Sequence, residues 1–151
     1  VVPELEEGEL KHCLHRFLGP QLQTPPPYSA AKHKGKPLYA YARQGVFIVK
    51  EPKPIEIAAI ELVGYDSTQH QLDVTVTCSK GTYIRVLAAD IGRTLGCGAH
   101  CIALRRLASG PFAVEESIDG EALFAAEGLS HAHQGLRSID EFLGRLVAPV
   151  F

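Results

Sequence analysis

The sequence contains no methionine and no tryptophan, and only four of its 151 residues are cysteines. These four, Cys13, Cys78, Cys97 and Cys101, form no C-x-x-C pair and are too few for a disulfide scaffold of this length. A reducing, cytoplasmic setting is therefore the simplest expectation. The absence of an initiator methionine favours a processed, trimmed or fragmentary chain.

Long hydrophobic runs are also lacking. No apolar stretch reaches the ~18 residues of a membrane helix, and the acidic start VVPELEEGEL is not typical of a signal peptide. Hydrophobic residues nevertheless make up 46% of the sequence, which favours a folded domain over a disordered chain. We expect one domain with a real core and no membrane partner.

The net charge of -2 conceals an uneven distribution of charge. Residues 31–53 carry six lysines and arginines and one acid, and residues 78–107 carry five against Asp90 alone. Four glutamates lie in the first nine residues, and seven acids follow Phe112. A local basic surface matters more for phosphate binding than the total charge does. Ordinary solvated charge on a mixed surface is an equally good explanation of this pattern.

Apolar spacing predicts helices and strands that alternate along the chain. Helices are expected over residues 6–18 and 37–44, with the first stopped by Gly19-Pro20 and an extended path through the three prolines between them. Another helix is expected from an N-cap at Thr82 to Gly96, and weak helical patterns lie near residues 121–126 and 138–146.

Strands are expected over residues 46–49, 55–63, 72–78 and 99–107. The second and third flank a turn, GYDSTQHQ, and we expect them to form an antiparallel hairpin with a long loop. Residues 72–78 alternate most clearly between apolar and polar side chains. The expected fold class is α/β of the α+β type, with a mixed, mainly antiparallel sheet and flanking helices.

The stretch CSKGTYIR, residues 78–85, joins an alternating strand to a helix and carries a candidate site. Tyr83 and Arg85 lie at the helix start, where free N–H groups attract anions and Lys80 adds positive charge. If the backbone is still extended there, both side chains point to one face, and if it is helical they diverge by about 200°. The structural alternative is a half-buried aromatic anchor at Tyr83 and an Arg85 paired with Asp90 or a surface acid.

Two long motifs resemble TruB-type tRNA pseudouridine synthases. PPPYSAAKHKGKPLYAYARQG, residues 25–45, resembles the central motif of that family, and CSKGTYIRVLAADIGRTLGCGAHCIALRRLASGPF, residues 78–112, resembles its second half. The resemblance implies a pseudouridine synthase catalytic-domain fold and isomerisation of a T-loop uridine of tRNA, position 55, to pseudouridine. It also implies that the base is flipped into a pocket and that no cofactor is needed.

The resemblance assigns catalytic roles to Tyr83, Arg85 and Leu104. Tyr83 matches the tyrosine that contacts the flipped base, and a tyrosine offers an apolar face with one polar tip. Arg85 matches the arginine that pairs with the catalytic aspartate, which a guanidinium can hold by two bonds. Leu104 matches the apolar residue that packs against the base and excludes water.

The same resemblance implies a set of RNA contacts, with the tRNA T-arm stem-loop as partner. Each contact between a cation and a phosphate would make binding weaken with salt. For each lysine, a merely solvated role is an equal alternative, and for Tyr28 it is packing beside the sheet. The candidates are Tyr28, Lys32, His33, Lys34, Lys36, Lys80, Arg105 and Arg106.

One essential part of the family pattern is missing. The family's catalytic aspartate lies in a G-x-L-D-P motif upstream of the Y-S-A segment, and this sequence has no such motif. None of its own aspartates is placed as a nucleophile: they are Asp66, Asp73, Asp90, Asp119 and Asp140. We therefore expect residues 1–151 to be the C-terminal portion of a catalytic domain, without the aspartate motif and without a C-terminal, PUA-like RNA-binding domain.

Such a chain is predicted to be inactive alone and to expose apolar surface, covered by the missing half or by self-association through a sheet edge. The alternative function is a non-catalytic RNA-binding module or one half of a split protein. A zinc site at Cys97, His100 and Cys101 is disfavoured because a fourth ligand is not evident, so no metal is expected.

Overall fold

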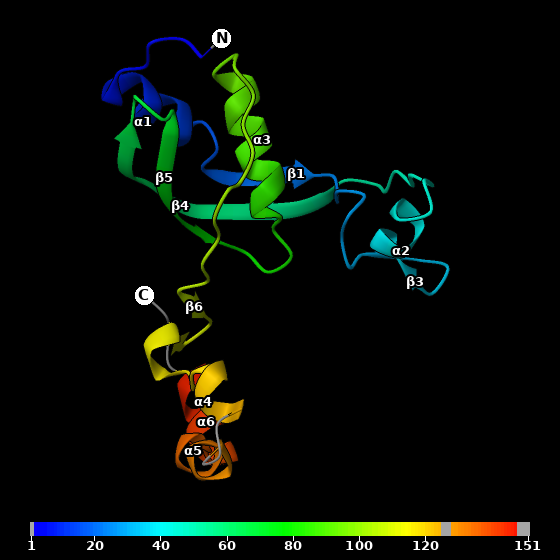
Figure 1. Ribbon diagram of the computed structural model, residues 1–151, viewed down its shortest axis with the longest axis vertical. Helices are drawn as coiled ribbons and strands as arrows, with labels where there is room; N and C mark the ends of the chain where they lie inside the picture. Colours follow the sequence, from blue (N-terminus) through cyan, green and yellow to red (C-terminus); the bar gives the residue numbers. More distant parts are fainter. Residues whose placement is uncertain (1, 125–127, 148–151) are drawn as a thin grey trace. The chain divides into compact units, whose positions relative to one another are not determined.

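The computed structural model describes residues 2–124 and 128–147 (Figure 1). The chain divides into two compact units, Val1–Ile102 and Ala103–Phe151. The elements of the first unit are α1 (Glu7–His15), β1 (Gly19–Gln23), β2 (Lys32–His33), β3 (Lys36–Pro37), α2 (Leu38–Ala42), β4 (Lys53–Asp66), β5 (Gln71–Cys78) and α3 (Ile84–Thr94). Those of the second are β6 (Ala108–Ser109), β7 (Phe112–Ala113), the 3-10 helix η1 (Val114–Glu116), α4 (Gly120–Phe124), α5 (Gly128–Gly135) and α6 (Ile139–Val147).

The first unit is built on a three-stranded antiparallel sheet in the order β1-β4-β5. Helices α1 and α3 pack on one face of it (Figure 1), where Leu14, Ile57 and Leu87 belong to a single buried cluster. The opposite face is polar and exposed, with Glu56 and Glu61 on β4. The predicted α+β fold with an antiparallel sheet and flanking helices is therefore confirmed.

The central hairpin follows the predicted apolar alternation but differs in its turn. β4 continues to Asp66, so the expected long loop is reduced to a short turn in which the Asp66 carboxylate accepts the N–H groups of Thr68 and Gln69 at 2.8 and 3.0 Å. An aspartate that caps its own turn in this way lets the strands run further. The register shifts between Ile57 and Ala59 and again between Leu62 and Gly64.

Helix α1 confirms the first predicted helix, although it ends earlier, at His15. Glu6 and Glu9 form a reciprocal capping box at its start, which satisfies otherwise unpaired N–H groups. Its buried face consists of Leu10, Cys13 and Leu14, at helical spacing. Burial raises the pKa of the Cys13 thiol. All four cysteines lie in the described part of the chain, and none forms a disulfide.

Two predicted strands are wrong. Residues 46–49 form no strand, and Val46, Phe47 and Val49 are exposed. Residues 99–107 also form no strand, and Ile102, Leu104 and Leu107 are exposed. Both segments have β-prone side chains, but neither meets a neighbouring strand among residues 2–124 and 128–147, and a strand is stable only when its backbone groups and one face have partners.

The N-cap of α3 also differs from the prediction. Tyr83, not Thr82, occupies this position, because the Thr82 hydroxyl donates a hydrogen bond back to the Ser79 carbonyl at 2.9 Å. Gly96 follows α3 with a positive φ of 81°, as expected for a residue that ends a helix.

The described part of the second unit contains the short hairpin β6–β7, the 3-10 helix η1 and the α-helices α4, α5 and α6. Phe112 stacks on Phe142 with ring centroids 5.3 Å apart, and Arg145 forms an ion pair with Glu116. The Arg145 guanidinium lowers the pKa of Glu116. The weak helical patterns of the sequence correspond to α4 and α6, with residues 125 and 126 outside the described part. No helix that the structure describes has the length and apolar character to cross a bilayer.

Candidate functional site

Tyr83 stands where the turn after β5 gives way to α3. Its backbone is extended, with φ −96° and ψ 101°, and helical geometry begins at Ile84. Gly81 supplies the positive φ of 85° that the turn requires. The Ser79 hydroxyl accepts the backbone N–H of Glu56 at 2.9 Å, which fastens the turn to β4. The predicted place of Tyr83 at a strand end and helix start is confirmed.

The backbone of Tyr83 is held by the side chain of Gln23, 60 residues earlier. The Tyr83 N–H donates to Gln23 Oε1 at 2.7 Å, and Gln23 Nε2 donates to the Tyr83 carbonyl at 3.2 Å. Gln23 is only 6% exposed. The side-chain amide of Gln23 therefore bonds both the N–H and the carbonyl of the candidate catalytic tyrosine. In a sheet, the backbone of a neighbouring strand would form these two hydrogen bonds.

Arg85 lies in the first turn of α3 and is exposed. Tyr83 is extended and Arg85 helical, so the backbone changes conformation between the two residues. Arg85 Nη2 donates to the Tyr28 carbonyl at 2.8 Å. Asp90 pairs with Arg93 at 2.8 Å, which excludes it as the partner of Arg85. No carboxylate among the described residues forms an ion pair with Arg85.

The Tyr28-Ser29 pair lies against this site through its backbone. Tyr28 is 51% exposed, so the alternative of a packed tyrosine is not supported. Ser29 is buried, and its carbonyl accepts the N–H of Tyr39 at 3.1 Å, which ties the segment to α2. Within the described part of the chain, the Ser29 hydroxyl is the one buried side-chain polar atom without a hydrogen-bond partner. Buried polar atoms are nearly always paired, so this hydroxyl is an exception among the described residues.

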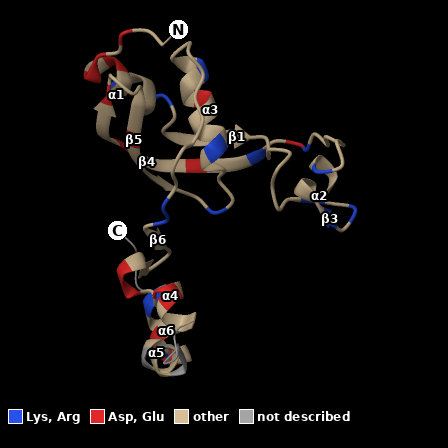
Figure 2. Cartoon of the chain, viewed as in Figure 1, with Lys and Arg blue, Asp and Glu red and all other residues tan. Residues whose placement is uncertain are grey.

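The basic candidates of the first unit lie mainly on the β2–β3 hairpin, where Figure 2 shows lysine at the turn. Lys32, Lys34 and Lys36 are exposed, and Lys34 has a positive φ of 47° next to Gly35 at 81°. The His33 carbonyl accepts the Tyr41 hydroxyl at 3.1 Å, and the two rings meet edge to face. The tight turn thus presents three lysine side chains to solvent, and Tyr41 stabilises the hairpin through its hydrogen bond to His33.

The remaining candidates are exposed as well. Lys80 lies in the turn before α3, in the first unit. Leu104, which is 65% exposed, Arg105 and Arg106 belong to the second unit. The structure therefore brings together Tyr28, Tyr83 and Arg85. Leu104, Arg105 and Arg106 instead lie before β6, in a segment without regular structure.

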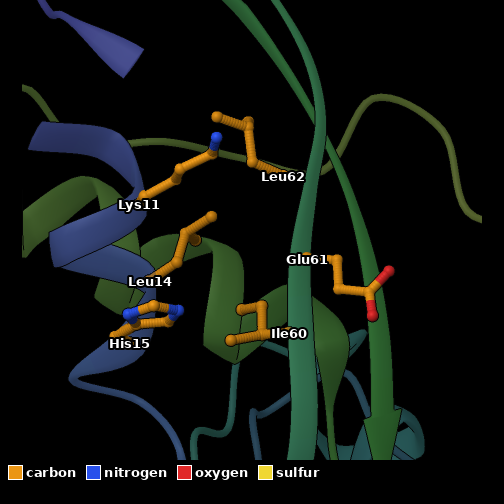
Figure 3. A pocket seen from close by; sticks show the side chains of 6 residues that line it. All are labelled: Lys11, Leu14, His15, Ile60, Glu61 and Leu62. Carbon is orange, nitrogen blue, oxygen red and sulfur yellow. The ribbon is translucent and has the colours of Figure 1, made fainter. Parts of the chain in front are cut away.

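Two shallow cavities lie along β4, away from these residues. The larger, of about 320 Å³, opens between α1 and β4 (Figure 3). Ile60 and Leu62 point from β4 toward Leu14 of the helix, whereas Glu61 points to the other side of the strand. Neither Tyr83 nor Arg85 lines this cavity or the second one, which is bounded by Glu7 and residues 62–65. In the described residues, no three His, Cys, Asp or Glu side chains form a group that could hold a metal ion.

Sequence reasoning missed Gln23. It is the last residue of β1, a strand that was not predicted because its five residues, GPQLQ, show no apolar alternation and begin with Gly-Pro. The one available signal was a glutamine two residues before the three prolines, which by itself indicates a turn as readily as a contact.

Comparisons with known proteins agree with this picture. Residues 1–84 match the family described as TruB family pseudouridylate synthase (N terminal domain), and residues 85–150 match the tRNA pseudouridylate synthase B C-terminal domain. The chain is 47% identical to tRNA pseudouridine synthase B of Bordetella parapertussis over 137 residues, which cover 91% of this chain and 54% of that protein. It is 42% identical to the protein of the same name from Desulfotalea psychrophila over 146 residues, covering 95% and 59%.

A chain of the crystal structure of a Cbf5-Nop10-Gar1 complex shares the fold, with a TM-score of 0.68 at 24% identity, over 96% of this chain and 41% of that one. The chain spans about half the length of the curated relatives it matches. The family match over residues 1–84 covers more than half of the chain and includes Gln23, Tyr28 and Tyr83. The chain therefore belongs to the TruB family of pseudouridylate synthases.

Proposed function

We propose that this chain supplies Tyr83, Arg85 and Leu104 to a tRNA pseudouridine synthase that isomerises the T-loop uridine at position 55. The observation that carries the proposal is the pair of residues at the start of α3. Tyr83 is fixed by Gln23, and Arg85 is held by the Tyr28 carbonyl without a carboxylate partner in the described chain. The relatives named tRNA pseudouridine synthase B support the same activity.

The reaction breaks the bond between N1 of uracil and C1′ of the ribose and forms a bond from C5 to C1′. The proton lost from C5 is balanced by the proton gained at N1, so the reaction is an isomerisation and consumes no co-reactant. In the proposed arrangement, Arg85 keeps Nε and Nη1 available for the catalytic carboxylate, because its hydrogen bond to the Tyr28 carbonyl uses Nη2. Tyr83 presents its ring and hydroxyl to the flipped base, and Leu104 excludes water from the glycosidic bond.

The basic residues are proposed to hold the T-arm stem-loop. Lys32, Lys34 and Lys36 project from one hairpin turn, and Lys80 projects from the turn that precedes Tyr83. Exposed cations on tight turns reach phosphates at little cost in backbone rearrangement. Tyr28, His33, Arg105 and Arg106 complete the proposed RNA-contacting set.

The catalytic aspartate is proposed to come from a segment outside this sequence, in a G-x-L-D-P motif. A PUA-like domain is likewise proposed to lie outside residues 1–151, which then form the C-terminal portion of the catalytic domain. No described aspartate contacts Arg85, and this supports an external carboxylate.

The proposal is tested by tritium release from T-arm RNA labelled at C5 of uridine. We expect no release by the 151-residue chain alone, because the carboxylate is absent. Joined to the part of the Bordetella parapertussis relative that precedes the matched region, it should turn over, and Arg85→Lys in the joined protein should reduce turnover by at least about tenfold. Arg93→Lys, on the same helix and paired with Asp90, is the matched control.

Turnover by the chain alone would refute the external aspartate. A joined protein that is folded and binds T-arm RNA but does not turn over would refute the catalytic proposal and favour a non-catalytic RNA-binding module.

The edge of β4 is proposed to receive the missing half or a second copy of the chain. β1 pairs only with residues 53–57 of β4, so on that side the strand has no partner among the described residues from Ala58 to Asp66. Both cavities flank this stretch. An unpaired strand edge favours strand addition. We expect concentration-dependent self-association of the isolated chain in sedimentation velocity, reduced by Leu62→Lys relative to the polar-face control Glu61→Lys. A monodisperse monomer at all concentrations would contradict this.

A further inference from the structure

We propose that Gln23 is a positioning residue that, together with the segment from Gln23 to Ser29, sets Tyr83 and Arg85 relative to each other. We call residues 23–29 the proline segment. The inference rests on the proposed function, because it treats Tyr83 and Arg85 as the groups that act on the uridine. Its structural part, the restraint on Tyr83, can be tested on the isolated chain.

The first anchor of the proline segment is the Gln23 side chain. It makes two hydrogen bonds to the backbone of Tyr83, at 2.7 and 3.2 Å, from a position that is 6% exposed. Hydrogen bonds shielded from water are stronger, and losing a partner leaves a buried backbone group unpaired. The side chain of the N-cap residue, Tyr83, makes no capping bond to α3, and the Gln23 amide holds the backbone at the entry to this helix.

The second anchor is the Tyr28 carbonyl, which accepts Arg85 Nη2 at 2.8 Å. A free arginine on a helix surface samples many rotamers, and this bond selects one of them. The Ser29 carbonyl accepts the N–H of Tyr39 at 3.1 Å, so α2 holds the far end of the segment. Arg85 is thus oriented from a backbone atom that is itself fixed.

The residues between the anchors resist changes in length. Pro25, Pro26 and Pro27 have φ confined near −65° by their rings and offer no backbone N–H. Pro25 is buried, which holds the middle of the segment against the protein. Tyr83, the N-cap of α3, and Arg85, in its first turn, are therefore bonded to the two ends of one stiff segment. A displacement at Gln23 is transmitted to Tyr83 directly and to Arg85 through the prolines.

Small errors in the placement of reacting groups reduce catalysis far more than binding. Gln23→Met keeps the length of the side chain but removes both hydrogen bonds to Tyr83. Gln21→Met is the matched control: Gln21 lies on the same strand, and its side-chain amide donates to the Phe17 carbonyl at 2.7 Å rather than to Tyr83. Gln23→Glu is the conservative variant, since its protonated carboxyl both donates and accepts, whereas the carboxylate only accepts.

The first measurement is amide hydrogen exchange of the 151-residue chain by NMR. We expect Gln23→Met to speed the exchange of the Tyr83 amide by about tenfold, from the loss of one buried hydrogen bond, while the Ile57 amide stays unchanged. In Gln23→Glu, the Tyr83 amide should stay protected both below and above the pKa of the introduced carboxyl, because its protonated and ionised forms both accept the Tyr83 N–H. Gln21→Met should leave the Tyr83 amide unchanged.

The second measurement is steady-state turnover of the joined protein described above. Gln23→Met should lower kcat by about 100-fold and change KM by less than about threefold, and Gln21→Met should change neither. Equal effects of the two methionine variants, or unchanged exchange at Tyr83, would overturn the inference. If the unaltered joined protein fails to turn over, the proposed function fails, and the exchange experiment still decides whether Gln23 restrains Tyr83.

Discussion

Gly92→Ala is expected to lower the free energy of unfolding by about 3 kcal/mol, the upper range for overpacking in a rigid site. A Cβ atom on Gly92 would overlap the backbone nitrogen of Ala99 and the carbonyl carbon of Gly98. These are main-chain atoms and cannot rotate away. The loop is also bonded to this point, since the N–H groups of Cys97 and Gly98 donate to the Gly92 carbonyl at 3.1 and 2.9 Å. Urea denaturation followed by circular dichroism measures the loss.

Gly8→Ala is the matched control for this prediction. Gly8 lies in α1, and a Cβ there would meet nothing within 4 Å. Alanine should raise the free energy of unfolding by about 0.5 to 1 kcal/mol, because glycine loses more backbone entropy in a helix. A Gly92→Ala variant as stable as the unaltered chain would show that residues 97–99 do not pack on α3.

Ile57→Ala is expected to cost about 2 to 5 kcal/mol of unfolding free energy, as for other fully buried aliphatic side chains. Ile57 is 0% exposed and belongs to the cluster formed by α1, β4 and α3. It also sits where β4 pairs with both neighbours, opposite Gly19 on β1 and Cys78 on β5. Truncation of Ile57 therefore leaves a cavity at the point where all three strands of the sheet are paired.

Val63→Ala is the comparison variant for Ile57→Ala. Val63 lies on the same strand, in the second register shift, and is 67% exposed. Its truncation should change stability by less than about 0.5 kcal/mol. Thermal melts and urea titrations of both variants test the difference. Equal losses would contradict the placement of the core between α1, α3 and this sheet.

The elements that could be predicted from the sequence are those that carry their own pattern. The apolar face of α3 extends over more than one helical turn, and the alternation of β5 extends over more than four residues. Each pattern is therefore long enough to predict its element from local periodicity alone. Residues 46–49 have the composition of a strand, but strand formation depends on a neighbour that no local window contains. The same holds for residues 99–107, which follow a loop bonded to the Gly92 carbonyl through Cys97 and Gly98.

In the candidate site, too, some features could be predicted from the sequence and others could not. The position of Tyr83 and Arg85 at a strand-to-helix junction was predictable, because the alternation ends at Cys78 and the helical spacing begins at Ile84. Their chemical roles came from resemblance alone. Gln23 was beyond prediction, because a hydrogen bond between residues 60 positions apart leaves no trace in either segment. For Asp90, the sequence suggested a contact that the structure does not show. It was an alternative partner for Arg85, but it pairs with Arg93, one turn further along the same helix.

The bonds from Gln23 and Tyr28 span 60 and 57 positions of the chain. Contacts of such separation close large loops, and their entropy cost is met only after nearby hydrophobic groups have collapsed. The orientation of the first turn of α3 therefore depends on the docking of β1 and the prolines as well as on the helix's own residues. A substitution that loosens the distant segment should disturb the tyrosine and arginine while leaving helix α3 itself in place.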